Sequence, residues 1–331
     1  MSETHDDQAQ LALGTGSERS LVFRSRHVLV THSRSVHWAA KFLPSDRRDD
    51  AAVVYAFCRL VDDIADESDD ADTARRQLDR LRDELAGPAP PRPLIAGYRD
   101  VCRRRGIDTD YAGELIRGVE SDLGAVVVET DAELLQYCYR VAGTVGLMMS
   151  PLLGVDDPGA RPHAIDLGVG MQLTNICRDV LEDAENGRVY LPAERLEDAG
   201  TSPTALLGGD PDRQAVSSVV SGLLDLAERY YQSGHEGMDF IPRRSRLAIM
   251  VASRVYRAIG LKLRQKGCDP LQGRTVVGGL GKLRWISTAL ADFLNPFDRS
   301  NPAAVEHDGE LHRPLGELPG TNPPLRELDA A

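Results

Sequence analysis

The chain has 331 residues, of which 42% are hydrophobic, and its formal net charge is −12 at pH 7. This length permits one large domain or two ordinary ones, each with an ample core. The acidic balance, without a basic cluster that carries aromatic residues, argues against nucleic acid as a partner. The five cysteines include no C-x-x-C pair, which indicates a reducing compartment without a disulfide framework or a zinc site among them.

No targeting or membrane-spanning segment is visible in the sequence. The first ten residues are polar and acidic, unlike a signal peptide. The longest uncharged stretch covers residues 141–155, which is shorter than the roughly 18–20 residues of a membrane span. We therefore expect a cytoplasmic protein that is soluble or at most peripherally associated with a membrane.

Helical patterns follow one another along most of the chain. Residues 1–20 are rich in Gly, Ser and Asp and are expected to be disordered. Asp49 and Asp50 open a helix, because acidic residues favour its positive end. Helical spacing of apolar residues predicts further helices over 71–86, 93–105, 110–124, 131–150, 160–183, 212–236, 243–266 and 280–294. Breaks are expected at 187–192 and 201–211, and the proline-rich residues 296–331 are expected to form a disordered tail.

The predicted fold class is all-α. The sequence has no period-2 strand of useful length, no alternation of strands and helices, and no repeat of fixed period. We therefore predict one large helical domain over residues 21–295.

Two short stretches carry most of the chemical information. They are C-R-L-V-D-D-I-A-D at 58–66 and N-I-C-R-D-V-L-E-D at 175–183, and each places aspartates four residues apart. On a helix such aspartates share one face, where their like charges call for a cation. An isolated pair of this kind is more often a solvated helix face. Both stretches follow apolar runs, however, so their helices are expected to be buried and their carboxylates to need partners. Mg²⁺ takes oxygen ligands and joins carboxylates to phosphates, so two facing motifs would bind a diphosphate through metal ions.

Four segments in order resemble one known family. Y-A-F-C-R-L-V-D-D-I-A-D-E at 55–67 and the stretch from Gln172 to Pro192 are similar to the two signatures of the squalene/phytoene synthase family. H-S-R-S at 32–35 and Y-C-Y-R-V-A-G-T-V-G at 137–146 resemble two other segments of it. The resemblance extends from about Thr31 to Leu294. It implies the isoprenoid synthase fold, a single helical domain around a central apolar cavity. It also implies head-to-head joining of two prenyl diphosphates through a cyclopropylcarbinyl diphosphate, with release of diphosphate.

The resemblance also implies roles for individual residues. The expected ligands of Mg²⁺, or of Mn²⁺ in its place, are Asp62, Asp63, Asp66, Asn175, Asp179 and Asp183. The expected catalytic residues are Asp62, Asp66, Asp179, Asp183, Tyr55, Tyr137 and Arg59. The expected diphosphate contacts are His32, Ser33, Arg34, Arg59, Gln172, Asn175, Arg178, Arg188, Tyr190 and Arg274. The expected prenyl pocket is Val36, Ala40, Val141, Ala142, Val145 and Gly146.

Several of these roles have plainer alternatives. Tyr55 and Tyr137 could be core aromatics, His32 a packing or capping residue, and Arg274 a surface charge. Two positions depart from the family pattern and put the shape of the pocket in doubt. Val36 replaces a usual aromatic, and Leu181 replaces a frequent glycine.

Substrate length is the main open question. C20 substrates would give phytoene, whereas C15 substrates would give squalene, dehydrosqualene or hydroxysqualene. The small residues Ala39 and Ala40 leave room for a long tail, and segments 245–260 and 273–277 resemble bacterial phytoene synthases. These features favour geranylgeranyl diphosphate as the substrate and phytoene as the product, for which NADPH is not expected.

Two alternatives from other functional classes are disfavoured by the motifs. A non-catalytic relative would typically lose metal-binding aspartates, and all five stand here. A terpene cyclase would carry a second motif with Ser or Thr and Glu, unlike the one at 175–183. Peripheral membrane contact is expected because the hydrocarbon product is insoluble in water, and no obligatory protein partner is evident.

Overall fold

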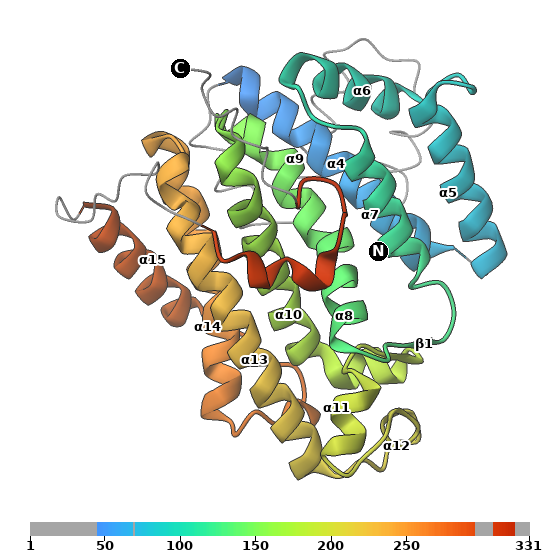
Figure 1. Ribbon diagram of the computed structural model, residues 1–331, viewed down its shortest axis with the longest axis vertical. Coiled ribbons are helices and arrows are strands. Elements are labelled where there is room, and N and C mark those ends of the chain that lie inside the picture. The colour runs from blue at the N-terminus through green and yellow to red at the C-terminus, as the bar shows by residue number, and fades with distance from the viewer. Residues whose placement is uncertain (1–44, 69, 295–306, 322–331) are drawn as a thin grey trace, which may run out of the picture.

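The computed structural model describes residues 45–68, 70–294 and 307–321. The predictions for residues 1–20 and for the H-S-R-S segment lie outside these ranges. The helices are α4 Ser45–Glu67, α5 Ala71–Ala86, α6 Pro93–Arg105, α7 Asp110–Glu120, α8 Asp131–Cys138, α9 Thr144–Leu153, α10 Arg161–Glu185, α11 Ala193–Asp198, α12 Pro203–Leu207, α13 Arg213–Glu236, α14 Arg243–Gln265 and α15 Gly279–Leu294. The predicted all-α fold class is confirmed, and the helices form a bundle (Figure 1).

Helix α10 runs through the centre of the bundle, beside α9 and α13 (Figure 1). Ile165, Val169, Leu173 and Ile176 follow one another at helical spacing and are at most 3% exposed. This apolar stripe is buried against the neighbouring helices, as the apolar run in the sequence predicts. The last turns of α10 carry the second aspartate motif, so the packing of this helix fixes where that motif lies.

The end of one helix shows how local sequence sets the boundaries. The side chain of Asp70 accepts a hydrogen bond from the backbone N–H of Thr73 at 2.8 Å and thereby caps the first turn of α5. At the other end Gly87 has a φ of 101°, a left-handed conformation that glycine adopts without steric cost. The predicted range 71–86 is therefore confirmed.

The helix predicted over 131–150 is interrupted by a π-helical turn. α8 and α9 are joined by a single π-helical segment, η1 Tyr139–Gly143. Just after it, the hydroxyl of Thr144, the first residue of α9, donates to the carbonyl of Arg140 at 2.7 Å, a side-chain bond that competes with the backbone hydrogen bonds of the helix. π turns are rare and often occur at functional sites. This one follows Tyr137, a predicted catalytic residue.

Two very short strands join distant parts of the chain. β1 Val126–Val127 pairs in parallel with β2 Arg188–Val189, with Val126 opposite Arg188. The pair ties the segment after α7 to the segment after α10. One helix appears where a break was expected, because the Ser202 side chain accepts from the N–H of Ala205 and caps α12.

The expectation of a disordered tail is wrong for residues 307–321. This segment contains the short 3-10 helices η6 Gly309–Leu311 and η7 Arg313–Leu315 and lies across the bundle (Figure 1). Tyr230 donates from its hydroxyl to the carbonyl of Leu311 at 2.7 Å. The prediction failed because frequent prolines exclude a long helix but do not prevent a segment from packing against the rest of the fold. Residues 296–306 and 322–331 lie outside the described ranges.

Among the described residues, no helix combines the length and the apolar character that a membrane crossing requires.

Candidate active site

The first aspartate motif occupies the last turns of α4. Asp62 and Asp66 are one turn apart and share a face of the helix. Asp63 is 8% exposed and forms an ion pair with Arg59 on the neighbouring face. The predicted metal ligands of α4 thus lie on two faces of the helix. Arg59, a predicted phosphate contact, is paired with Asp63 in this structure.

The second motif occupies the last turns of α10. Arg178 donates from Nε to the carboxylate of Asp179 at 2.8 Å. Arg274, which follows α14 in the chain, reaches the same carboxylate at 3.1 Å and also pairs with Glu182. The structure therefore brings Arg274 to the motif, although only a short segment of sequence pointed to it.

Asp122, just beyond α7, joins the predicted tyrosines. Its two oxygens accept hydrogen bonds from the hydroxyls of Tyr137 at 2.9 Å and of Tyr190 at 2.6 Å. The two rings are stacked with centroids 4.8 Å apart. Asp122 was not among the predicted site residues, because a single aspartate at the end of a helix carries no spacing signal. Only the β1–β2 pairing, which brings the two segments together, reveals it.

The charges of both motifs converge on Asp122 and Arg188. Asp122 interacts electrostatically with Asp62 and Asp66 of the first motif and with Asp183 of the second. Arg188 interacts with Asp66, Asp122 and Asp183. These interactions place carboxylates of both helices in one region that also holds Arg188.

Burial dominates the electrostatics of this region. It raises the pKa of Asp62 to about 7, an effect that Arg59 opposes and Asp66 reinforces. Burial and then the charge of Asp179 raise the pKa of Asp183 to about 7, although Arg188 lowers it. The pKa of Asp122 rises to about 6 for the same first reason, against the hydrogen bonds of its two tyrosines. Several carboxyls that resist ionisation in one region are a common mark of a functional site.

The donor set fits a hard cation. Asn175 donates from Nδ2 to Gln172 Oε1 at 3.3 Å, which leaves its own Oδ1 as an acceptor. That oxygen is buried and has no hydrogen-bond partner among the described residues. A buried, unpaired oxygen one turn before Asp179, beside carboxylates of raised pKa, offers the ligands that Mg²⁺ prefers.

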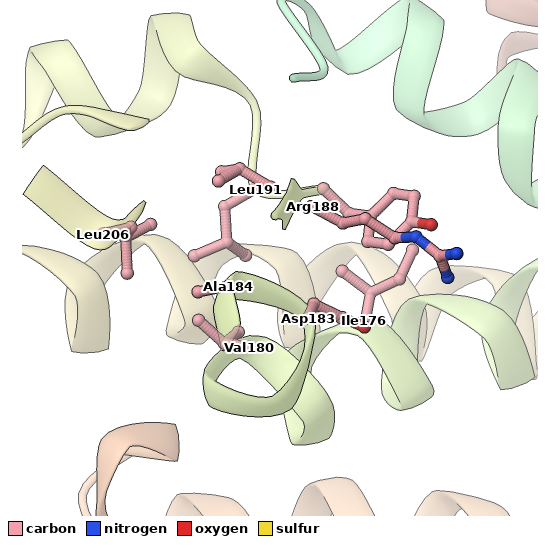
Figure 2. Close-up of a pocket in the computed structure, with 9 residues that line it drawn as sticks. Ile176, Val180, Asp183, Ala184, Arg188, Leu191 and Leu206 are labelled. Atoms are coloured by element: carbon pink, nitrogen blue, oxygen red, sulfur yellow. The ribbon is translucent and has the colours of Figure 1, made fainter. Parts of the chain in front are cut away.

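A small pocket adjoins the second motif, between α10 and the segment that begins at Arg188. Figure 2 shows Asp183 and Arg188 on one side of it, and Val180, Leu191 and Leu206 on the other. Asp183 and Arg188 are the two charged residues of this lining, and apolar Ile176 lies beside them (Figure 2).

The remaining predicted residues are not brought into this site by a described contact. His32, Ser33, Arg34, Val36 and Ala40 lie outside the described residues. Tyr55 is half-buried on α4 against the core. Val141, Ala142, Val145 and Gly146 are half-buried in η1 and α9. Gly146 packs so closely on α10 that an added Cβ would lie 2.3 Å from the carbonyl oxygen of Ala164. The prenyl pocket therefore stays a prediction.

Comparisons with known proteins find relatives over most of the chain. The squalene/phytoene synthase family profile matches residues 29–280. A 15-cis-phytoene synthase from Paracoccus sp. is 37% identical over 273 residues, covering 80% of this chain and 88% of the relative. A 15-cis-phytoene synthase from Pantoea ananas is 33% identical over 300 residues, covering 87% and 97%. A crystal structure of a dehydrosqualene synthase in complex with a ligand superposes with a TM-score of 0.71 at 27% identity, covering 82% of this chain and 96% of that one.

Proposed function

Because the chain belongs to the squalene/phytoene synthase family, we propose that it joins two geranylgeranyl diphosphates head to head to give phytoene. The observation that carries the proposal is the convergence of two aspartate motifs on Asp122 and Arg188. Such a region can hold a diphosphate at one end of a helical bundle.

The acidic and amide side chains would bind metal ions, and the arginines would bind the diphosphate of the first substrate. Asp62, Asp66, Asp179, Asp183 and the free oxygen of Asn175 would hold Mg²⁺. When bound, the metal neutralises the departing diphosphate and so favours cleavage of the allylic C–O bond. Charge-assisted bonds from arginines to phosphate oxygens assist the same step.

Arginines are available for this role once the substrate and metal arrive. Arg188 forms no ion pair with another described residue and interacts electrostatically with Asp66 of the first motif and Asp183 of the second. Arg178 and Arg274 form ion pairs with Asp179 in this structure. Metal at Asp179 would compete with these pairs and release the guanidinium groups toward phosphate.

The Asp122–Tyr137–Tyr190 group would stabilise the carbocation steps. In these steps the C1–O bond of one substrate breaks and the double bond of the second attacks C1. Loss of a proton to the released diphosphate then closes the three-membered ring of the cyclopropylcarbinyl diphosphate. That intermediate loses its diphosphate, rearranges to the 1–1′ linkage and loses a proton. Two stacked rings polarised by a buried carboxylate present electron-rich faces to such a cation.

Two observations favour the C20 substrate. The relatives named phytoene synthase are 32–37% identical over 71–87% of this chain. The dehydrosqualene synthase structure is 27% identical. The alternative is a C15 substrate, which would give squalene, dehydrosqualene or hydroxysqualene.

A product assay tests the proposal directly. Purified protein with Mg²⁺ is given geranylgeranyl or farnesyl diphosphate, with and without NADPH, and hexane extracts are read by mass spectrometry. A C40 hydrocarbon formed from the C20 substrate without NADPH is the expected result. C30 material from farnesyl diphosphate alone would assign the C15 alternative, and no coupled product from either substrate would overturn the head-to-head reaction.

A matched pair of variants on α10 tests the site. Asp183→Asn should lower turnover by at least about 100-fold, the scale of losing one electrostatic group in an active site. Glu185→Gln removes an exposed carboxylate two residues further along and should leave turnover unchanged. Equal turnover in the two variants would remove Asp183 from the site.

Peripheral membrane contact of a cytoplasmic enzyme remains a prediction. On α15 the side chains of Leu283, Ile286 and Leu290 recur on one face and are 62%, 42% and 44% exposed. They support contact with a lipid surface near which the hydrocarbon product could be released. Flotation with phospholipid vesicles would test it, and a Leu283→Ser variant that floats equally well would contradict the assignment of this face.

A further inference from the structure

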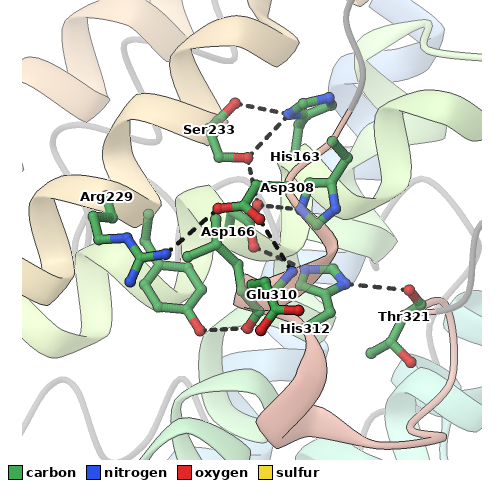
Figure 3. A network of polar contacts seen from close by, with 11 residues as sticks. His163, Asp166, Arg229, Ser233, Asp308, Glu310, His312 and Thr321 are labelled. Atoms are coloured by element: carbon green, nitrogen blue, oxygen red, sulfur yellow. Dashed lines mark hydrogen bonds and ion pairs between the residues drawn. The ribbon is translucent and has the colours of Figure 1, made fainter.

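A second cluster of titratable groups lies at the other end of α10. Asp166 is fully buried, and its two carboxylate oxygens face two histidines of the C-terminal segment. Oδ2 lies 2.7 Å from Nε2 of His307, and Oδ1 lies 2.8 Å from Nε2 of His312. Among the described residues, these three form the group of metal-ligand type whose donor atoms all lie within 4.8 Å of one another. Figure 3 shows His312 and Asp166 facing each other in this network.

The cluster is separate from the aspartate motifs. Asp166 precedes Asp179 by thirteen residues on one helix, which corresponds to about 20 Å at 1.5 Å per residue. Its donors also differ in kind, since imidazole nitrogens suit Zn²⁺ and carboxylate oxygens alone suit Mg²⁺. Nothing in the prenyl chemistry uses these residues.

The outer contacts of the cluster suit a metal ion better than a simple hydrogen-bonded cluster. Nδ1 of His312 lies 3.2 Å from the carbonyl oxygen of Thr321, which can only accept. Nε2 of the same ring faces the Asp166 carboxylate, so both ring nitrogens of His312 face oxygen acceptors, and a neutral ring can donate to only one of them. If Nε2 binds a metal ion, Nδ1–H donates to Thr321 and a neutral ring satisfies both sides. This is the usual arrangement around a metal-bound histidine.

The Asp166 carboxylate also has an outer hydrogen-bond partner. The hydroxyl of Ser233 on α13 donates to Asp166 Oδ2. Ser233 is itself held by His163, whose Nδ1 lies 2.8 Å from the Ser233 carbonyl oxygen and 3.2 Å from its hydroxyl. The carboxylate therefore has an outer partner of the kind that orients a metal ligand.

From this arrangement we infer that Asp166, His307 and His312 bind a divalent transition-metal ion, with Zn²⁺ as the reference ion, and that it fastens the C-terminal segment to α10. Zinc bonds of about 2.0–2.1 Å require donor separations of about 3.3 Å. The carboxylate lies 2.7 and 2.8 Å from the two imidazole nitrogens, so these pairs need to separate by about half an ångström. Three protein ligands leave a fourth position for water. The bond between Asp166 and His307 closes a loop of 141 positions, which is the kind of long closure from which a metal clip gains most in principle.

Metal binding is measured on the full chain without an affinity tag. The protein is stripped with a chelator, supplied with excess Mg²⁺ to occupy the oxygen site, and titrated with Zn²⁺ and separately with Co²⁺. We expect one Zn²⁺ per chain after desalting, a rise in Tm, and visible Co²⁺ absorption of a four-coordinate site. X-ray absorption of the zinc-loaded wild type should show two imidazole ligands, a readout that does not depend on any variant folding.

Substitutions assign the ion to the cluster. His307→Gln and His312→Gln should each weaken Zn²⁺ binding by more than about 100-fold, and Ser233→Ala by about 10-fold, as for an outer partner. His235→Gln removes an exposed histidine of α13 and should change nothing. Failure of the wild type to retain Zn²⁺, an all-oxygen ligand set, or unchanged binding in both ligand variants would overturn the inference. The cluster would then be an ion-paired contact alone.

Discussion

At the scale of single residues, burial disfavours the charged form of the aspartates in the candidate active site. Asp62, Asp122 and Asp183 all have a raised pKa, with burial as the first cause. Packing alone would favour an apolar or neutral side chain at each position, because a buried charge is unfavourable without a partner. Three such positions in one region point to a partner that arrives with the substrate.

The raised pKa values make the stability of the fold depend on pH. For Asp62 and Asp183 the pKa is about 7 in the folded state and 3.8 by reference, so between these values the folded chain holds more protons than the unfolded chain. Stability must therefore fall as pH rises through about 7. We expect the Tm measured in EDTA to decline from pH 5 to pH 8, and Mg²⁺ with diphosphate to reverse the decline, because metal replaces the protons.

Two variants separate this effect from the overall negative charge. Asp62→Asn should flatten the decline, whereas Asp198→Asn removes the same charge from an exposed position and should leave it. A Tm in EDTA that stays level or rises over this range would contradict the assignment of buried carboxylates.

Asp122 permits a prediction that the sequence could not supply. In Asp122→Asn the tyrosine hydroxyls of residues 137 and 190 lose a charged acceptor while the volume is kept. We expect turnover to fall about 100-fold, as for loss of one electrostatic group, with KM changed much less. Steady-state kinetics of the C20 reaction would measure this, with circular dichroism as the control for folding. Turnover within a factor of two of wild type would show that the carboxylate is only structural.

At the scale of elements, the predictions succeeded where the controlling contacts are local. The ranges 71–86 and 93–105 match α5 and α6, because caps and apolar spacing are written within each segment. The π turn at Tyr139–Gly143 was not predicted. The β1–β2 pair was not predicted either, because it depends on partners far along the chain. The site follows the same rule. Its paired aspartates could be predicted from their spacing in the sequence. The contribution of Asp122, and the position of Asp62 and Asp63 on different faces of α4, became visible only in the structure.

The crossing of α9 and α10 depends on two glycines. A Cβ at Gly146 would lie 2.3 Å from the Ala164 carbonyl oxygen, and one at Gly168 would lie 2.5 Å from that of Ala142. Because backbone atoms cannot turn aside, Gly146→Ala must push the helices apart, at a cost of about 1–3 kcal/mol. The free energy of unfolding in urea would measure it.

Gly113→Ala on α7 is the matched control. An added Cβ there meets no atom within 4 Å, so helix propensity should stabilise this variant by about 0.5–1 kcal/mol. A Gly146→Ala variant as stable as the wild type would mean that the two helices can separate freely, and that the register between η1 and the second aspartate motif is not fixed by this crossing.

At the scale of the whole molecule, the C-terminal segment joins parts of the bundle that follow one another only distantly in sequence. It accepts a hydrogen bond from Gln136 of α8 at Pro314, and another from Tyr230 of α13 at Leu311. Through Asp166 it also contacts α10, the helix that carries the second motif. The segment thus spans three helices of one core and is expected to unfold together with them.

Leu315 tests whether the segment belongs to that core. Its side chain is 1% exposed, so Leu315→Ala should lower the global free energy of unfolding by about 2–4 kcal/mol through lost burial and a residual cavity. Arg313→Ala, two residues away with an 80% exposed side chain, should change it by less than about 0.5 kcal/mol. Urea unfolding of both variants, done in chelator so that no metal contributes, would compare them. If Leu315→Ala leaves the global value unchanged, the segment opens on its own before the bundle unfolds. Its hold on α10 would then be a local contact and not part of the cooperative fold.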